Sequence, residues 1–340
     1  MKTLLLSRDD VEHSICLSEV IDAVESAYRI FQNDGVIQPP IQAMNLPKTA
    51  AESDVKSCYN DESGYFSIKT VGLFPGNAKG LGAYRSETGA NLPNMMGNII
   101  LGDGQTGAAL AIMDASLITG IRTGAAGALS AKYLARSDAD TVAVFAAGAQ
   151  ARMQILALAQ VRKLRQIRVF DRFAPPEVLS AYKRDMAAAT GATVQICQSV
   201  EEAAHDADIL ICVTPSREFY LKEAYVKAGA HIIEIGVDDI GKNELEPSLF
   251  SRADKVICDS IPQCLARGET RNAVQAGVFT EAQIYGEIGE LILGRKNGRE
   301  QEDEITIFDS TGMAIQDNET AALCYQSAVR KGIGSWFAFI

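Results

Sequence analysis

The sequence predicts an α/β protein, with a doubly wound parallel sheet of the Rossmann type and a second α+β domain. From about residue 140 onward, short and almost continuously apolar runs alternate with helical patterns. A parallel sheet needs this alternation because helices cover both of its faces. Between residues 36 and 110, short β-like runs are separated by clusters of Gly, Asn and Pro, which predict an antiparallel or mixed sheet. A chain of 340 residues has room for two such domains.

Individual elements follow from local patterns. Residues 18–32 carry apolar side chains on one helical face and predict an amphipathic helix, with Ser18 as its cap and Gly35 at its end. After the 36–110 sheet, an Ala-rich run that ends near Arg136 predicts a connecting helix. The strands of the parallel sheet are expected at 142–146, 167–171, 192–197, 208–213, 231–235, 255–259 and 305–309.

The composition is typical of a globular protein and excludes several classes of partner. Hydrophobic residues make up 47% of the chain, charged residues make up 22%, and the formal net charge is −11. A phosphate-binding face needs clustered Lys and Arg, and no such cluster occurs. We therefore expect neither nucleic acid nor a membrane as a partner.

Cysteine usage and the N-terminal residues bear on location. The seven cysteines form no CxxC pair, and several stand in apolar runs, as reduced core thiols do. The first residues contain too few apolar side chains for a signal peptide, and no apolar run approaches the roughly 18 residues of a membrane span. We expect a cytoplasmic protein.

The strand, turn and helix that open the parallel sheet predict a dinucleotide site. The turn fits the G-x-G-x-x-G/A pattern as Ala146-x-Gly148-x-x-Ala151, with Ala in place of the first glycine. The missing side chain at Gly148 allows a pyrophosphate to approach the backbone amides at the start of the next helix. Taken alone, so degenerate a pattern is equally consistent with an ordinary strand-to-helix turn.

An acidic residue at the end of the next strand strengthens the nucleotide interpretation. Asp171 closes the run Ile167-Arg-Val-Phe-Asp171 at the spacing where such folds bind the ribose hydroxyls. Its charge would repel the extra phosphate of NADP, whereas a guanidinium at Arg172 would attract it. We expect NAD as the cofactor, with NADP as the alternative.

Other catalytic arrangements find little support. No Ser/His/Asp arrangement is evident, and structural or surface roles are expected for His13, His205 and His231. No HExxH motif and no Cys/His cluster at ligand spacing occurs, so we expect no metal site.

Several ordered motifs make the sequence resemble, over nearly its whole length, the ornithine cyclodeaminase/mu-crystallin family, which includes archaeal-type alanine dehydrogenases and ketimine or imine reductases. The motifs are Ser67-Ile-Lys-Thr-Val-Gly72 with Phe74-Pro-Gly-Asn77, Ala111-Ile-Met-Asp-Ala115 with Thr119-Gly-Ile-Arg-Thr-Gly-Ala-Ala126, Ala147-Gly-Ala-Gln-Ala-Arg152, Ile235-Gly-Val-Asp-Asp-Ile-Gly-Lys-Asn-Glu-Leu245, Gly286-Glu-Ile-Gly-Glu290 and Phe308-Asp-Ser-Thr-Gly-Met-Ala-Ile-Gln-Asp317.

The resemblance implies a homodimer and a division of the chain. Residues 1–119 and 315–340 would form the substrate-binding and dimerisation domain, and residues 120–314 the inserted NAD-binding domain. The cofactor contacts expected on this basis are Arg122, Thr123, Ala147, Gly148, Ala149, Gln150, Asp171, Arg172, Val213, Thr214 and Gly236.

It also implies catalytic roles for three charged residues. Lys69 and Arg122 would hold the substrate carboxylate near the nicotinamide, and Asp238 would transfer the proton of the substrate nitrogen. Two cations and one carboxylate suit an α-amino acid, which carries one anion and one ammonium. From the residues alone, blander interpretations are favoured: a solvated strand lysine, a phosphate clamp and the acidic end of a strand.

Departures from the family pattern limit the substrate assignment. Family enzymes for amino acids commonly carry an Arg in the first sheet strand, where Gln38-Pro-Pro-Ile41 has Ile. We hypothesise that Arg85, in the long stretch from Asn77 to Leu92, replaces this cation. Ornithine cyclodeaminases follow the lysine strand with an Asn-Gly-His-Pro type of sequence, whereas this chain has Gly72-Leu-Phe-Pro75.

Three functions remain, and one is preferred. We predict an NAD(H)-dependent oxidoreductase acting on the C–N bond of a small amino or imino acid, either an amino acid dehydrogenase or an imine or ketimine reductase. The first alternative is an ornithine cyclodeaminase-type ammonia lyase that uses NAD catalytically. The second is a non-catalytic ligand-binding protein similar to mu-crystallin.

Overall fold

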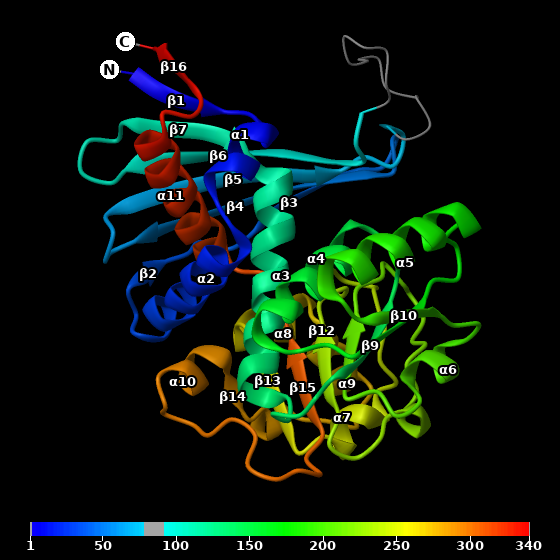
Figure 1. The fold of residues 1–340 in the computed structure, drawn as a ribbon. Coiled ribbons are helices and arrows are strands. Elements are labelled where there is room, and N and C mark those ends of the chain that lie inside the picture. The colour runs from blue at the N-terminus through cyan, green and yellow to red at the C-terminus, as the bar shows by residue number, and fades with distance from the viewer. Residues whose placement is uncertain (1, 78–91, 340) are drawn as a thin grey trace. The chain divides into compact units, whose positions relative to one another are not determined.

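The computed structural model describes residues 2–77 and 92–339, and the chain divides into two compact units (Figure 1). Unit 1 contains Met1–Arg122 and Met313–Ile340, and unit 2 contains Thr123–Gly312. The chain passes from unit 1 to unit 2 within helix α3 (Ala115–Leu134).

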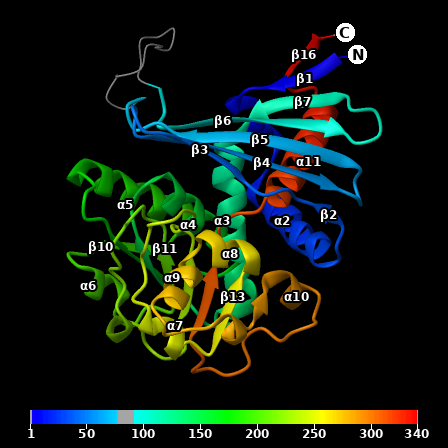
Figure 2. The ribbon, with the colours of Figure 1, turned by 180° about the vertical axis from the view of Figure 1, so that it is seen from behind.

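Unit 1 is built on a mixed sheet in the order β16-β1-β7-β6-β5-β4-β2, with β3 paired to β4. Strand β1 runs parallel to β7, and the other neighbouring pairs are antiparallel. Figure 2 shows β1 and β16, which bring the two ends of the chain side by side. The strands are β1 (Lys2–Leu6), β2 (Val36–Ile37), β3 (Gln42–Leu46), β4 (Ala51–Asn60), β5 (Tyr65–Leu73), β6 (Met95–Asp103), β7 (Ala109–Asp114) and β16 (Ser335–Ala338).

Three further helices belong to unit 1: α1 (Arg8–Ser14), α2 (Leu17–Gln32) and α11 (Ala314–Lys331). Helix α11 packs against α2 and against strands β4, β5 and β6. The expected Ser18 cap of α2 is wrong, because the cap is Cys16, whose amide donates a hydrogen bond of 3.0 Å to the Glu19 carboxylate.

Unit 2 contains a second sheet, in which every neighbouring pair of strands is parallel. Its order is β10-β9-β8-β11-β12-β15-β13-β14, so the strand order reverses between β8 and β11. The strands are β8 (Thr141–Phe145), β9 (Gln166–Phe170), β10 (Thr193–Ile196), β11 (Ile209–Cys212), β12 (His231–Glu234), β13 (Lys255–Cys258), β14 (Gly286–Glu287) and β15 (Thr306–Asp309). Dinucleotides bind outside the carboxyl ends of the strands at such a reversal.

Helices alternate with these strands and bury their apolar faces. The helices are α4 (Ala149–Val161), α5 (Pro176–Thr190), α6 (Val200–Ala204), α7 (Ser248–Arg252), α8 (Ile261–Arg267), α9 (Glu269–Gln275) and α10 (Ile288–Ile292). The buried faces of β8, β11 and β12 form much of the hydrophobic core. The predicted fold class is therefore confirmed, and each predicted strand lies within one residue of its expected position.

Two further expectations concern membranes and cysteines. In residues 2–77 and 92–339, no helix combines the length and the apolar character needed to cross a bilayer. The cysteines are free thiols, and all except Cys16 are buried.

Candidate functional site

Strand β5 places Lys69 inside unit 1. Side chains of a strand alternate between its two faces, so Ser67 and Lys69 are buried while Ile68 and Thr70 are exposed. Lys69 retains only 1% of its accessible surface. A lysine is almost never so buried unless its ammonium group has a partner.

Asp317 is that partner, and it also binds Arg122. Lys69 Nζ lies 2.7 Å from Asp317 Oδ2, and Arg122 Nε donates a 3.0 Å hydrogen bond to Asp317 Oδ1. The Asp317 side chain is 1% exposed and lies in the first turn of α11, where the positive end of the helix dipole favours a carboxylate. The structure thus brings two of the predicted site residues, Lys69 and Arg122, onto one buried carboxylate.

Burial and charge shift the protonation of this group. Burial lowers the pKa of Lys69 to about 7, with Asp317 opposing the shift and Arg122 and Lys56 adding to it. Burial alone would raise the pKa of Asp317, but the charges of Lys69 and Arg122 outweigh it and hold this pKa below its usual value. Asp317 is therefore a carboxylate at neutral pH, whereas Lys69 readily gains or loses a proton.

Polar side chains hold this group in place. Gln316 Oε1 accepts hydrogen bonds from Arg122 (3.2 Å) and from the Met313 amide (2.7 Å), and its amide nitrogen donates to the Tyr28 hydroxyl (2.8 Å). Lys69 also donates to the Thr119 hydroxyl at 3.3 Å. Each cation therefore has one anionic and one neutral acceptor.

In unit 2, the glycine turn follows β8 as predicted. Gly148 caps helix α4, and a methyl group built on its Cα would meet nothing within 4 Å. This position is therefore open to a close-approaching ligand, and Ala149 begins the helix beyond it. Ala146 adopts a positive φ of 155°, where the fingerprint carries its first glycine.

Asp171 lies beside this turn. Its Oδ2 atom accepts a 2.9 Å hydrogen bond from the Ala147 amide, and its Oδ1 atom accepts from the amides of Phe173 and Ala174, each at 2.9 Å. The carboxylate is held rigidly next to Gly148, while Arg172 is exposed and stacks over the Phe173 ring.

Two side chains near the start of α4 bear on the fit of a cofactor. The side-chain nitrogen of Gln150 is buried and has no hydrogen-bond acceptor among the residues described. Such an orphaned donor, together with the open face of Gly148, fits a ligand that brings acceptor oxygens. Gln154 donates a 2.9 Å hydrogen bond to the Thr123 carbonyl and so fixes Thr123 against the same helix.

Three more predicted contacts follow the next two strands. Val213 and Thr214 follow β11, and Gly236 follows β12. A Cβ on Gly236 would lie 2.5 Å from the Thr214 carbonyl oxygen, so these two residues touch through their backbones. Because β8, β11 and β12 are neighbours in one parallel sheet, their carboxyl ends share an edge with Gly148.

Asp238 lies farther along the segment after β12, with half of its side chain exposed. Its carboxylate forms an ion pair with Lys242, and its carbonyl oxygen accepts a hydrogen bond from Arg267. The sequence did not indicate either partner. Arg85 lies outside the described residues.

Of the three histidines, one is buried and two lie at the surface. His231 is buried between the hydroxyls of Ser130 and Thr306, and burial lowers its pKa to about 3, so its ring is neutral. His13 belongs to α1, and the exposed His205 directly follows α6.

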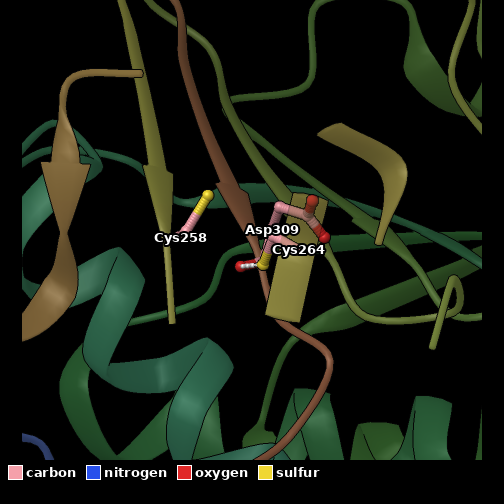
Figure 3. A group of neighbouring side chains, drawn as sticks. All are labelled: Cys258, Cys264 and Asp309. Carbon is pink, nitrogen blue, oxygen red and sulfur yellow. Dashed lines mark hydrogen bonds between the residues drawn. The ribbon is translucent and has the colours of Figure 1, made fainter. Parts of the chain in front are cut away.

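Cys258 at the end of β13, Cys264 in the middle of α8 and Asp309 at the end of β15 lie close together (Figure 3). Their candidate metal-ligand atoms all lie within 4.8 Å of one another. Their hydrogen bonds stay within the protein: Cys264 donates to the Asp309 carbonyl (3.3 Å), and Asp309 Oδ2 accepts from the Thr270 amide (2.8 Å) and hydroxyl (2.6 Å). Burial raises the pKa of the Cys264 thiol well above its usual value. We interpret this group as packing.

Sequence reasoning missed Asp317, Gln316 and Thr119. Asp317 is the last residue of a motif used for the family resemblance, but an acidic residue in a first helical turn is read equally well as a dipole partner. Asp317 stands three or four residues from apolar side chains, on the face of the helix that faces inward. That position was the available signal, because a charge on a buried face needs a partner.

Comparisons with known proteins identify the family. Residues 1–332 match the model of the Ornithine cyclodeaminase/mu-crystallin family. Alanine dehydrogenase of Archaeoglobus fulgidus is 36% identical over 340 residues, which cover 100% of this chain and 99% of that protein.

Solved structures are similar over the whole chain. An archaeal alanine dehydrogenase dimer with bound NAD has a TM-score of 0.91 and 35% identity, with 100% of both chains covered. Delta(1)-pyrroline-2-carboxylate reductase of Thermococcus litoralis, in complex with NADH and L-proline, has a TM-score of 0.91 and 33% identity, with 98% of this chain and 99% of that chain covered.

Proposed function

The chain belongs to the ornithine cyclodeaminase/mu-crystallin family, and on this basis we propose that it is an NAD(H)-dependent oxidoreductase acting on the C–N bond of a small amino or imino acid. Its named relatives include an alanine dehydrogenase and imino-acid reductases, and solved relatives hold NAD or NADH.

The charge of the Lys69, Arg122 and Asp317 group is the observation that carries this proposal. Two cations share one carboxylate, so with Lys69 protonated these three side chains together carry one net positive charge. Buried charge of this kind is costly unless a partner neutralises it. The α-carboxylate of an amino or imino acid supplies one negative charge and suits the planar guanidinium of Arg122.

The remaining residues take roles that follow from their chemistry. Bound NAD accepts a hydride from the substrate α-carbon in oxidation, and bound NADH returns it in reduction. Lys69 and Arg122 hold the substrate carboxylate and so orient the α-carbon. Asp238, directly or through a water molecule, takes the proton that leaves the substrate nitrogen in oxidation and returns it in reduction. Gly148, Gln150 and Asp171 bind the cofactor.

A substrate panel tests the proposed function. Purified protein is mixed with NAD and amino acids, or with NADH and small imino acids or 2-oxo acids plus an amine, while nicotinamide absorbance is followed. We expect a steady change in absorbance with at least one small substrate. Ammonia release from ornithine or lysine with no net absorbance change would indicate a cyclodeaminase. Saturable NADH binding without turnover would indicate a ligand-binding protein.

Asp171→Ala should relax the preference for NADH over NADPH. The Asp171 carboxylate is fixed next to the glycine turn, where its charge would bond the ribose hydroxyls and repel a 2′-phosphate. We expect the ratio of kcat/KM for NADH to that for NADPH to fall about tenfold. Asp185→Ala, which removes a half-exposed carboxylate of the same unit, is the control. An unchanged ratio in Asp171→Ala would mean that another residue determines the preference for NADH over NADPH.

We also propose that two copies of the chain associate through unit 1. Apolar side chains are exposed on strands β2, β3 and β5 of its sheet, as at surfaces that bind another protein. They are Ile37, Met44, Leu46, Ile68 and Leu73. Sedimentation velocity should therefore report a dimer, and the mass of a single chain would contradict this proposal.

A further inference from the structure

Glu244 is a buried carboxyl group to which neither the sequence nor the proposed mechanism assigns a role. It follows β12, has no exposed surface, and forms no ion pair with any residue in the described part of the chain. One of its oxygens, Oε1, accepts three hydrogen bonds: from the Thr214 amide (2.7 Å), the Thr214 hydroxyl (2.6 Å) and the Tyr220 hydroxyl (2.5 Å). A single oxygen atom thus fixes the segment that follows β11.

The other oxygen of Glu244 lies against Gly236. A Cβ at Gly236 would come within 1.9 Å of Glu244 Oε2 and within 2.5 Å of the Thr214 carbonyl oxygen. No side chain fits in this space, so the three residues form one tight contact. The Glu244 carboxyl group therefore sets the position of both Thr214 and Gly236.

The backbone of Glu244 is held as firmly as its side chain. Its amide donates a 2.8 Å hydrogen bond to Glu269, and its carbonyl oxygen accepts from the amides of Tyr220 (3.0 Å) and Leu221 (3.1 Å). Burial raises the pKa of Glu244, and the carboxyls of Glu234 and Glu269 lie nearby without a cation among them. The three hydrogen bonds to Oε1 therefore hold this buried side chain in place.

We propose that Glu244 is a positioning residue for the nicotinamide half of the cofactor, acting through Thr214 and Gly236 without touching the cofactor itself. This inference rests on the proposed function. In a doubly wound sheet, the strands on the two sides of the reversal bind the two nucleotide halves. Gly148 and Asp171 belong to the β8 and β9 side, whereas Thr214 and Gly236 belong to the β11 and β12 side.

Binding of two ligands of different length distinguishes a positioning role of Glu244 from general damage to the fold. NADH and ADP are titrated into the wild type, Glu244→Ala and Glu244→Gln by calorimetry. We expect Glu244→Ala to bind ADP as the wild type does and to bind NADH about tenfold more weakly, because the lost acceptor frees the Thr214 segment. Glu244→Gln keeps a carbonyl oxygen in place of Oε1 and should bind NADH within about twofold of the wild type.

Two further variants test whether this interpretation of Glu244 is correct. Tyr220→Phe removes the third donor to the same oxygen, leaves Thr214 and Gly236 untouched, and keeps its ring against Phe145, so NADH binding should not change. If Glu244→Ala does not fold, Gly236→Ala applies the test from the other side, because its methyl group would clash with both the Glu244 carboxyl and the Thr214 carbonyl oxygen. It should weaken NADH binding and spare ADP binding.

The outcomes are distinguishable. Wild-type NADH affinity in Glu244→Ala, an equal loss of ADP and NADH binding in the alanine variants, or a Glu244→Gln variant as weak as Glu244→Ala would each overturn the positioning role while the proposed function stands. A wild-type protein that binds no NADH would overturn the proposed function and this inference with it.

Discussion

Replacing Lys69 by alanine should lower kcat/KM for the amino or imino acid by about 10³-fold while leaving NADH affinity within about twofold. The ammonium of Lys69 is one of two cations that we assign to the substrate carboxylate, and it is held by Asp317 in a buried setting. Its loss removes both the attraction and the orientation of the α-carbon. Steady-state kinetics and NADH fluorescence titration measure the two effects separately.

The pH dependence gives this prediction a second measurement. Because burial lowers the pKa of Lys69 to about 7, the side chain is an ammonium below this pH and a neutral amine above it. The kcat/KM of the wild type should fall as the pH rises through about 7, since this parameter reports groups of the free enzyme. The alanine variant should lack that decline.

Asp238→Ala serves as a companion variant with a different expected pattern. It should also lower kcat/KM strongly and spare NADH binding, but the decline near pH 7 should persist in the remaining activity because Lys69 is intact. Loss of NADH binding in either variant would refute the assigned roles. The surface pair formed by Arg165 and Asp140 supplies a control. Arg165 precedes β9, at the opposite end of that strand from Asp171, so Arg165→Ala should leave kcat/KM unchanged.

The sequence predicted the regular elements because each has a local signal. The parallel strands are short, continuously apolar runs, and the structure buries every residue of β8, β11, β12, β13 and β15. Strand β16 gave no such signal, since all four of its residues are exposed and it forms only by pairing with β1. Strand β14 is too short, at two residues, to show a period.

The site residues also differ in how far the sequence alone predicts them. Gly148 and Asp171 stand at a spacing set by one strand-turn-helix-strand unit, so the sequence alone indicates them. The roles of Lys69 and Arg122 were predicted only through the family resemblance, because a single lysine in a strand is expected to be solvated. Their common partner, Asp317, is 195 residues from Arg122 along the chain, and only the packing of α11 on β5 reveals the pair.

Of the substitutions proposed for unit 1, Asp317→Asn should lower the free energy of unfolding most. The change leaves the buried Lys69 and Arg122 without their counter-ion, at an expected cost of roughly 3–5 kcal/mol. Trp336, the single tryptophan of the sequence, lies in β16 and reports on unit 1 in denaturant unfolding followed by fluorescence. Glu62→Gln, which removes the half-exposed partner of Arg29 in the same unit, should cost less than about 1 kcal/mol.

The sign of the pH effect distinguishes lost charge from lost packing. The pKa of Asp317 is held below its ordinary value of 3.8, so its contribution to stability is complete at neutral pH and is lost as the pH falls through the folded-state pKa. The gap between wild type and Asp317→Asn in the free energy of unfolding should therefore narrow as the pH falls below about 4. A gap no larger than that of Glu62→Gln would show that Asp317 does not neutralise the two cations. If Asp317 does neutralise them, binding of a small carboxylate should stabilise Asp317→Asn more than the wild type, because the variant presents two unneutralised cations to the same anion.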